Sequence, residues 1–381
     1  MKIALITEAE LARSHGTGAQ LLRLFEGLQY HHLYWGVRHG RRSEVRNSSL
    51  LADPETGVDL LSKIKRRARR YSGLSWWNGS SVNRGKLQAL LSGIQADFDV
   101  AFVVVGRESD AARAWSLVTR LGCPYIVWVV DIMHEGGLDP ESMPGFRALL
   151  ANAAAVLSLM PSISSELIKF GVSPVEVFVG QHVHSVMASP PVNGQPIRIV
   201  TGGRPYSGGC RFLAQAWPAI QAQFPHVELV YVGPHFADLP EELRPVAANR
   251  GFLEEDAYRR CLAECHIAFL SGPDLLDMFG KFSFPSRTSD YLMAGLPVVG
   301  KVPAHSATQK VLMPLQPQAV RMVQTDAQLM DALNALLAPE AWSRASQMVR
   351  AYAERFFSLE RNRGVIMGLL STARGEVVCT T

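Results

Sequence analysis

The sequence has few cysteines, no long apolar run and no large excess of one charge. Its five cysteines among 381 residues are scattered and odd in number, which argues against a disulfide framework and favours a reducing, cytoplasmic compartment. The longest apolar runs, Val100–Val105 and Tyr125–Val130, are far shorter than the ~20 residues that a transmembrane helix needs. A formal net charge of +4 is too balanced for a protein dedicated to nucleic acid.

The rest of the composition is that of an ordinary globular chain. Hydrophobic residues make up 48% and charged residues 19%, so the chain can bury a sizeable core. At roughly 100–200 residues per domain, the length predicts two domains or three. Near the N-terminus a short apolar stretch is followed by Glu8 and Glu10, so we expect no secretory signal peptide.

Short apolar runs alternate with segments that have helical spacing. Runs rich in β-branched residues are typical of strands buried on both faces. The predicted strands are Ile3–Ile6, Val100–Val105, Tyr125–Val130, Ala155–Leu159, Ile197–Val200, Glu228–Val232, Ile267–Leu270 and Pro297–Val299. Helical spacing marks Ala19–Leu28, Arg211–Gln221 and Ser289–Met293. This alternation predicts an α/β fold with parallel sheets and right-handed crossovers.

A segment rich in Pro, Gly, Ser and Asn interrupts the alternation near the middle of the chain. We interpret this segment, residues 187–195, as a linker between two doubly wound domains, the first of which spans residues 1–186. Ligands of doubly wound sheets bind beyond the carboxyl ends of the strands. We therefore expect the site in the cleft between the two domains.

The segment Lys281–Gly300, KFSFPSRTSDYLMAGLPVVG, predicts a helix that begins near Arg287 or Thr288. The unpaired N–H groups of such a helix start suit a phosphate, to which Arg287 adds a cation and Ser286 a hydroxyl. Asp290, one turn further on, is placed to accept hydrogen bonds from ribose hydroxyls. A plain capped helix explains the same residues, so both interpretations stay open.

The stretch FPSRTSDYLMAGLPVVG resembles the donor-site signature of GT-B glycosyltransferases, especially of glycosyltransferase family 4. The segment Val200–Trp217, VTGGRPYSGGCRFLAQAW, is similar to the glycine–arginine loop and helix of that family, and Arg250–Leu270 to its segment near the nucleotide base. The resemblance implies two Rossmann-like domains, the first for the acceptor and the second, residues 196–358, for the donor. It also implies a C-terminal helix, within residues 359–381, that crosses back to the first domain.

On this resemblance we expect transfer of a sugar from a nucleotide diphospho-sugar to an acceptor hydroxyl. The resemblance implies retention at the anomeric carbon. We expect no metal or other cofactor, because the helix start and the arginines can neutralise the leaving diphosphate. The acceptor would be a glycan, a lipid-linked molecule or a small molecule, in the synthesis of polysaccharides or cell-envelope glycans. The implied donor-binding residues are Gly16, Gly18, Arg204, Gly233, Phe252, Ser286, Arg287, Thr288 and Asp290.

Three positions depart from the pattern of the family. Its second donor glutamate falls on Asp290, and its first falls on Phe282, so that carboxylate is absent. Its phosphate-binding lysine falls on Gly208 or Gly209. Two alternatives therefore stay open: a non-catalytic protein that binds a nucleotide sugar or a partner transferase, and a GT-B sugar-nucleotide epimerase.

Asp131 and His134 are the candidate catalytic residues. Both follow the predicted strand Tyr125–Val130, and side chains at the carboxyl end of a parallel strand point into the cleft. An acid and a histidine at this spacing can orient or deprotonate the acceptor hydroxyl. A loop cap is the alternative interpretation.

The segment Lys63–Arg70, KIKRRARR, holds six basic residues of eight, and Trp76 and Trp77 follow it. Removing these six charges would change the formal net charge from +4 to −2. Cations beside aromatic rings suit an anionic membrane surface, so we expect peripheral binding to the inner face of the membrane or contact with the acceptor. A solvated surface is the alternative, and no nucleic-acid-binding module surrounds the segment.

Neutralising the basic segment is expected to weaken membrane binding without changing donor affinity. Glutamine at Lys65, Arg66, Arg67, Arg69 and Arg70 removes five charges. Each basic residue near an anionic surface contributes about 1 kcal/mol of attraction. Cosedimentation with phosphatidylglycerol-containing vesicles measures the loss, and vesicles of phosphatidylcholine alone are the control. Equal partition of the wild-type and substituted chains into anionic vesicles would contradict the prediction.

Overall fold

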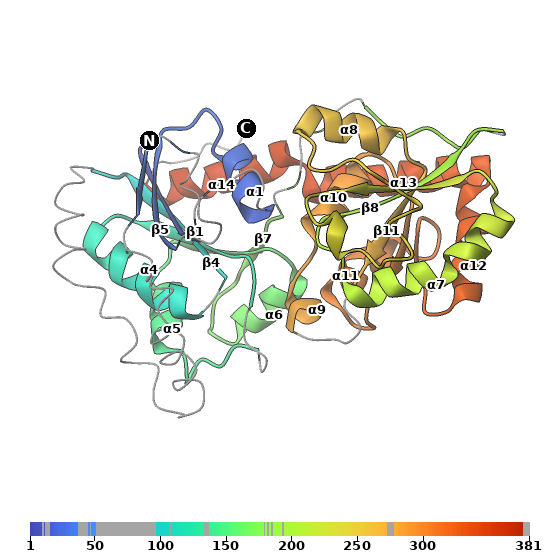
Figure 1. Ribbon diagram of the computed structural model, residues 1–381. Helices are drawn as coiled ribbons and strands as arrows, with labels where there is room; N and C mark the ends of the chain where they lie inside the picture. Colours follow the sequence, from blue (N-terminus) through green and yellow to red (C-terminus); the bar gives the residue numbers. More distant parts are fainter. Residues whose placement is uncertain are drawn as a thin grey trace, which may run out of the picture.

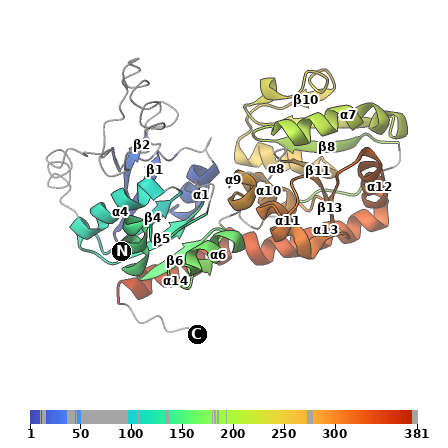
Figure 2. The ribbon, with the colours of Figure 1, turned by 90° about the horizontal axis from the view of Figure 1, so that it is seen from below.

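The computed structural model describes residues 1–9, 11, 16–36, 45, 47–50, 97–106, 108–132, 137–178, 180, 183, 186–192, 194–272 and 278–375. These residues form two α/β lobes that lie side by side, with a long helical segment running along both (Figures 1 and 2). Within them, no helix combines the length and the apolar content needed to cross a membrane.

The first lobe holds a seven-stranded parallel sheet in the order β3-β2-β1-β4-β5-β6-β7. Its strands are β1 (Ile3–Ala9), β2 (Tyr30–Gly36), β3 (Ser48–Leu50), β4 (Val100–Val105), β5 (Tyr125–Val129), β6 (Ala155–Ser158) and β7 (Val175–Glu176). Its helices are α1 (Gly16–Leu24), α4 (Glu108–Leu121), α5 (Pro144–Ala151) and α6 (Pro161–Ile168). All four strands predicted in this half are confirmed.

Strand β4 shows why the sheet needs helices on both faces. Successive side chains of a strand point to opposite faces, and every residue of β4 is buried. Ala101, Val103 and Val105 belong to the hydrophobic cluster that includes α4 and α5. Val100, Phe102 and Val104, on the other face, belong to a second cluster. This second cluster also includes Leu21 and Leu24 of α1. The continuous apolar run is therefore divided between two cores.

The second of these cores is completed by the last helix, α14 (Leu359–Ala373). Its residues Leu359, Ile366 and Leu370 are fully buried in the same cluster as Phe102 and Trp128. The helix lies against β4, β5 and α1. Figure 2 shows it beneath the first lobe. Residues near the C-terminus thus cover a face of the N-terminal sheet.

The second lobe holds a six-stranded parallel sheet in the order β10-β9-β8-β11-β12-β13. Its strands are β8 (Ile197–Gly202), β9 (Val227–Val232), β10 (Ala247–Asn249), β11 (Ile267–Ser271), β12 (Val298–Lys301) and β13 (Val320–Met322). Its helices are α7 (Ser207–Gln223), α8 (Glu255–Ala263), α9 (Met278–Phe282), α10 (Ser286–Met293), α11 (Ala307–Leu312), α12 (Asp326–Leu337) and α13 (Pro339–Phe357), with single 3₁₀ turns at Phe236–Asp238 and Met313–Leu315. The four strands predicted in this half are confirmed as β8, β9, β11 and β12.

One of the predicted helices has the wrong boundaries. The helix expected at Ala19–Leu28 is α1, which begins at Gly16 and ends at Leu24, because the chain turns before Gly27 with its positive φ of 73°. Helix α10 begins at Ser286, next to Arg287, so the predicted start near Arg287 is confirmed. Pro285 takes the N-cap position, and its carbonyl accepts the N–H of Thr288 at 2.8 Å.

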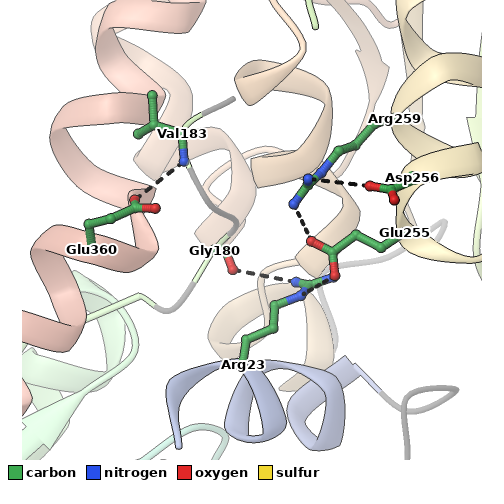
Figure 3. A network of polar contacts seen from close by, with 7 residues as sticks. All are labelled: Arg23, Gly180, Val183, Glu255, Asp256, Arg259 and Glu360. Carbon is green, nitrogen blue, oxygen red and sulfur yellow. Dashed lines mark hydrogen bonds and ion pairs between the residues drawn. The ribbon is translucent and has the colours of Figure 1, made fainter. Parts of the chain in front are cut away.

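The chain passes between the lobes around Gly180 and again at Phe357–Leu359, and these two crossings touch. A Cβ atom at Gly180 would lie 2.2 Å from the carbonyl oxygen of Phe357, so only glycine fits there. The amide of Asn362 donates to the carbonyl of Phe178 at 2.7 Å. The Glu360 carboxylate accepts the N–H of Val183 at 3.3 Å (Figure 3). The crossings are therefore tied together by packing and by hydrogen bonds.

Shortening one apolar side chain of α14 is expected to destabilise the first lobe. Ile366→Ala leaves a cavity under a fully buried side chain, which costs about 2–5 kcal/mol of unfolding free energy. Urea denaturation measures this loss. Thr372→Ala, at an exposed position of the same helix, is the control and should change the free energy by less than about 0.5 kcal/mol. Equal effects of the two substitutions would mean that α14 does not cover the sheet.

Candidate functional site

The strand order of the second sheet marks a point where a ligand can enter. From β8 the chain proceeds to β9 and β10 on one side, and from β11 to β12 and β13 on the other. The connections after β8 and β11 therefore leave in opposite directions and open a crevice beyond their carboxyl ends. These ends are Gly202 and Ser271, the last residues of the two strands.

Three glycines let the backbone close tightly around this crevice. A Cβ atom at Gly202 would lie 2.3 Å from the carbonyl oxygen of Val232, and one at Gly209 would lie 2.6 Å from the Cα of Ser271. Gly203 has a φ of +69°, and a Cβ atom there would lie 2.5 Å from Nη1 of Arg287. Any larger residue would displace either the backbone or the guanidinium.

Arg287, in the first turn of α10, projects into the crevice. Its Nη2 lies 3.4 Å from the carbonyl oxygen of Ser271, and its Nη1 lies 3.5 Å from that of Arg204. These are long and therefore weak hydrogen bonds. Among the described residues, the buried Nε has no partner. The guanidinium thus keeps donors available for an anion, and Arg204 adds an exposed cation beside it.

The first turn of α10 presents further donors at the same place. No side chain caps the helix, so its first N–H groups are not satisfied by a cap. Thr288 is fully buried, and its hydroxyl has no partner within the described part of the chain. Ser286 is half-buried, and its carbonyl accepts the hydroxyl of Ser289 at 2.7 Å. Asp290, also half-buried, lies one turn further on.

Tyr231 fixes the backbone of the crevice, a role that no local motif indicated. Its hydroxyl donates to the carbonyl of Gly203 at 2.5 Å. Burial raises the pKa of Tyr231 to about 12, against an ordinary value of 10.0, while the nearby Arg287 guanidinium lowers it. The phenol is therefore neutral at physiological pH and acts as a donor.

Gly233 and Phe252 lie on the loops beside Gly203. The N–H of Gly233 donates to the carbonyl of Gly251 at 2.8 Å, so the loop after β9 is tied to the loop after β10. A Cβ atom at Gly233 would lie 3.0 Å from the backbone nitrogen of Gly203. Phe252, the next residue after Gly251, is 51% exposed. An exposed aromatic ring thus stands beside the crevice.

Asp131 reaches this region from the first lobe. It follows β5, and the hydroxyl of Ser283 donates to its Oδ1 at 2.6 Å. Ser283 stands three residues before Ser286, where α10 begins. Ser271, Ser283 and Pro285 line one pocket. The structure therefore brings Asp131 to the segment that leads into α10, although more than 150 residues separate them in sequence.

Helix α1, which begins with the glycine segment of the first lobe, contacts the second lobe through its last turn. Gly16 and Gly18 lie in the first turn of this helix, and Arg23 in its last. Nε of Arg23 lies 3.4 Å from Oε2 of Glu255 in α8, and its Nη1 donates to the carbonyl of Gly180 at 3.4 Å (Figure 3). Arg259 pairs with the same glutamate. This ion-pair network joins the two lobes.

Comparison with known proteins identifies the architecture. No protein-family model matches the chain, and no curated protein matches it. The structure of HepE from Anabaena in complex with UDP matches with a TM-score of 0.68 at 11% identity, over 98% of this chain and 100% of that one. Sucrose-phosphate synthase from Thermosynechococcus elongatus matches with a TM-score of 0.65 at 15% identity, over 98% of both chains. The chain has the GT-B fold.

The structure of a UDP-N-acetylglucosamine 2-epimerase also matches, with a TM-score of 0.57 at 12% identity, over 97% of this chain and 96% of that one. At such identities the likeness concerns the fold alone. Membership of glycosyltransferase family 4 stays a prediction. So do the roles of the residues placed above.

Several predicted residues lie outside the described part of the chain. They are His134, Lys65, Arg66, Arg67, Arg69, Arg70, Trp76 and Trp77. The proposed partnership of Asp131 with His134, and the basic segment as a membrane or acceptor contact, therefore stay predictions. Among the residues that the structure does describe, no group of three or more His, Cys, Asp or Glu is arranged to hold a metal ion.

Removing the hydroxyl of Tyr231 is expected to destabilise the second lobe in a pH-dependent way. Tyr231→Phe leaves the Gly203 carbonyl without this donor, at a cost of about 1–3 kcal/mol near pH 7. As the pH rises, the Tyr231 phenol loses its proton near pH 10 in the unfolded chain and only near pH 12 in the folded chain. Above about pH 10 the wild-type protein therefore loses the stability that this hydroxyl adds over phenylalanine.

Urea denaturation between pH 7 and pH 11 measures the difference between the two proteins, which should shrink above about pH 10. Tyr206→Phe is the control, since the hydroxyl of Tyr206 makes no hydrogen bond to any described residue. A difference that stayed constant over this pH range would show that the Tyr231 phenol does not titrate as a buried donor.

Proposed function

We propose that the protein is a glycosyltransferase that moves a sugar from a nucleotide diphospho-sugar to an acceptor hydroxyl. The observation that carries the proposal is Arg287, whose guanidinium lies in the crevice beyond the carboxyl ends of β8 and β11, where, among the described residues, its two Nη groups make only long hydrogen bonds. The comparison structures support it, because HepE was captured with UDP and with UDP-glucose.

In this proposal the second lobe binds the diphosphate of the donor. Arg287 and Arg204 pair with phosphate oxygens, and Ser286 and the first N–H groups of α10 donate to them. The hydroxyl of Thr288 is fully buried, so it would donate only after a shift at the start of the helix. When the bond between the anomeric carbon and the β-phosphate oxygen breaks, negative charge builds up on the nucleoside diphosphate. Fixed donors at that position stabilise the transition state more than the ground state.

The remaining donor contacts would come from three neighbouring elements. Asp290 accepts hydrogen bonds from the ribose hydroxyls. Gly233 and Phe252 lie where the base would bind, with the aromatic ring of Phe252 available for stacking. Gly16 and Gly18, at the start of α1, approach the diphosphate from the first lobe. The donor would therefore be held from both sides of the cleft.

Asp131 is the proposed catalytic residue on the acceptor side, with His134 as its proposed partner. As the new glycosidic bond forms to the acceptor oxygen, the hydroxyl proton passes to Asp131, to His134 or to solvent. The hydroxyl of Ser283 donates to one oxygen of Asp131 and fixes its position. Acceptor choice, which we propose to be a glycan, a lipid-linked molecule or a small molecule, depends on loops of the first lobe.

Two departures from the family pattern have structural reasons. Phe282 is buried in the main hydrophobic cluster, so no carboxylate occupies the position of the first donor glutamate. The phosphate-binding lysine of the family falls on Gly208 or Gly209, and at Gly209 its Cβ would lie against Ser271, so a lysine does not fit at that position. Arg204 and Arg287 would have to supply the positive charge. We propose a metal-independent reaction on that basis, and retention at the anomeric carbon only by resemblance.

The same departures favour the second candidate, a protein that binds a nucleotide sugar without transferring it. A site that has lost a carboxylate and a cation still offers Arg287 and the N-terminus of α10 for binding. An epimerase with this fold is the third possibility. Product analysis separates the three, since only transfer or hydrolysis releases the nucleoside diphosphate, and only epimerisation yields an isomeric nucleotide sugar.

Arg287→Ala is expected to weaken donor binding. Hydrogen bonds to charged groups contribute about 1.5–3 kcal/mol, so the dissociation constant should rise by roughly 10–150-fold. Isothermal titration calorimetry with UDP, GDP, ADP and their glucose conjugates measures the affinity, and chromatography measures release of the diphosphate with and without EDTA. The control is Arg344→Ala, an exposed arginine of α13 far along the chain from the crevice.

Unchanged affinity in Arg287→Ala would refute the proposed donor site. Tight binding without release of a diphosphate, on any acceptor, would favour the non-catalytic protein. Arg287→Lys should rescue affinity in part, because a lysine supplies the charge without the planar donors of a guanidinium.

A further inference from the structure

A second cavity lies where the two lobes meet, on elements other than those of the donor crevice. Its volume is about 370 Å³, within the range of small-molecule sites. The first lobe contributes residues around the start of α6, and the second lobe contributes Phe284 and part of α11. The end of α13 and the start of α14 close it. We call this cavity the hinge pocket. It is lined by Leu159, Met160, Pro161, Glu176, Phe178, Phe284, Lys310, Val311, Pro314, Tyr352, Phe356, Phe357 and Arg361.

Five aromatic rings form one wall of the hinge pocket. Phe178, Phe284 and Phe357 are buried and pack on one another, with ring centroids 4.9–5.6 Å apart. Tyr352 packs against Phe356 at a tilt of 45°, with centroids 4.6 Å apart, and its hydroxyl donates to the carbonyl of Val311 at 2.5 Å. The rings are thus held in place before any ligand binds. Such a preformed apolar wall suits a flat or branched apolar group.

The polar residues of the hinge pocket include two exposed cations. Among the described residues, the ammonium group of Lys310 has no polar partner. Within the same described residues, the guanidinium of Arg361 has only a 3.5 Å contact with the side-chain oxygen of Asn362. The one carboxylate, Glu176, accepts the hydroxyl of Ser164 at 2.9 Å. An anionic group near Lys310 and Arg361 would therefore find two cations that no carboxylate neutralises in the described structure.

We propose that the hinge pocket binds one small amphipathic anion. Its aromatic or branched apolar body packs on the five rings, and its carboxylate, sulfonate or phosphate lies near Lys310 and Arg361. The volume is that of a single small molecule, and residues from both lobes are needed to form it. None of the donor-binding residues lines this pocket, so the site is separate from the donor crevice.

The test uses two probes with related ring systems and different charge. The anionic probe is 8-anilinonaphthalene-1-sulfonate, and the neutral probe is N-phenyl-1-naphthylamine. Fluorescence titration of the full chain should show saturable binding of one sulfonate per chain. Lys310→Gln combined with Arg361→Gln should weaken binding of the sulfonate about tenfold, in keeping with two partly solvated ion pairs, and leave the neutral probe unaffected.

The control is Lys169→Gln combined with Arg344→Gln, which removes the same charge from exposed positions that do not line the pocket. It should leave the affinity of both probes unchanged. Phe356→Ala, at a ring that is 38% exposed, should weaken both probes by removing part of the wall. The melting temperature of each variant is measured alongside, so that unfolding is not mistaken for loss of the site.

Arg287→Ala separates this site from the donor crevice and does not depend on the proposed function. Binding of the sulfonate should be unchanged in that variant. Loss of binding in Arg287→Ala, more than one probe per chain, or equal affinity of the wild-type chain and the Lys310–Arg361 double variant would each overturn the proposal.

Discussion

Strands buried on both faces are the constraint on which the rest of this structure depends. An apolar run such as Val100–Val105 sends alternate side chains to opposite faces, and each face needs a helix to exclude water. In the first lobe α14 supplies part of this cover, although it comes from the far end of the chain. The chain must therefore cross twice between the lobes, and the crossings meet where Gly180 packs against Phe357.

The short segment Ser283–Arg287 joins three parts of the molecule. Ser283 donates to Asp131 of the first lobe, Phe284 packs in the aromatic wall between the lobes, and Arg287 enters the crevice of the second sheet. Proline at position 285 holds the chain extended just before α10 begins. A shift of this segment at any one of the three contacts must be felt at the other two.

Most of the central strands could be predicted from local sequence pattern, because continuous apolar runs such as Tyr125–Val130 are typical of strands buried on both faces. Strand β2 was missed, since His31 and His32 interrupt its apolar character; His32 is nonetheless buried and is paired with Thr7 at 2.8 Å. The place of Arg287 at the start of α10 could be predicted, because the sequence around it indicates where that helix begins. The contacts of Tyr231 and Ser283 could not be predicted, because their partners are distant in sequence and are brought together only by tertiary packing.

The ion pair between Arg23 and Glu255 is weak by itself, because both side chains are partly exposed to water. Such pairs contribute about 0.2–1 kcal/mol. Because the two crossings are tied together, the connection between the lobes is short. It keeps Arg23 and Glu255 at an effective concentration on the order of millimolar or above. A contact of that size is then enough to favour the arrangement of the lobes that the structure shows, and breaking it would not require either lobe to unfold.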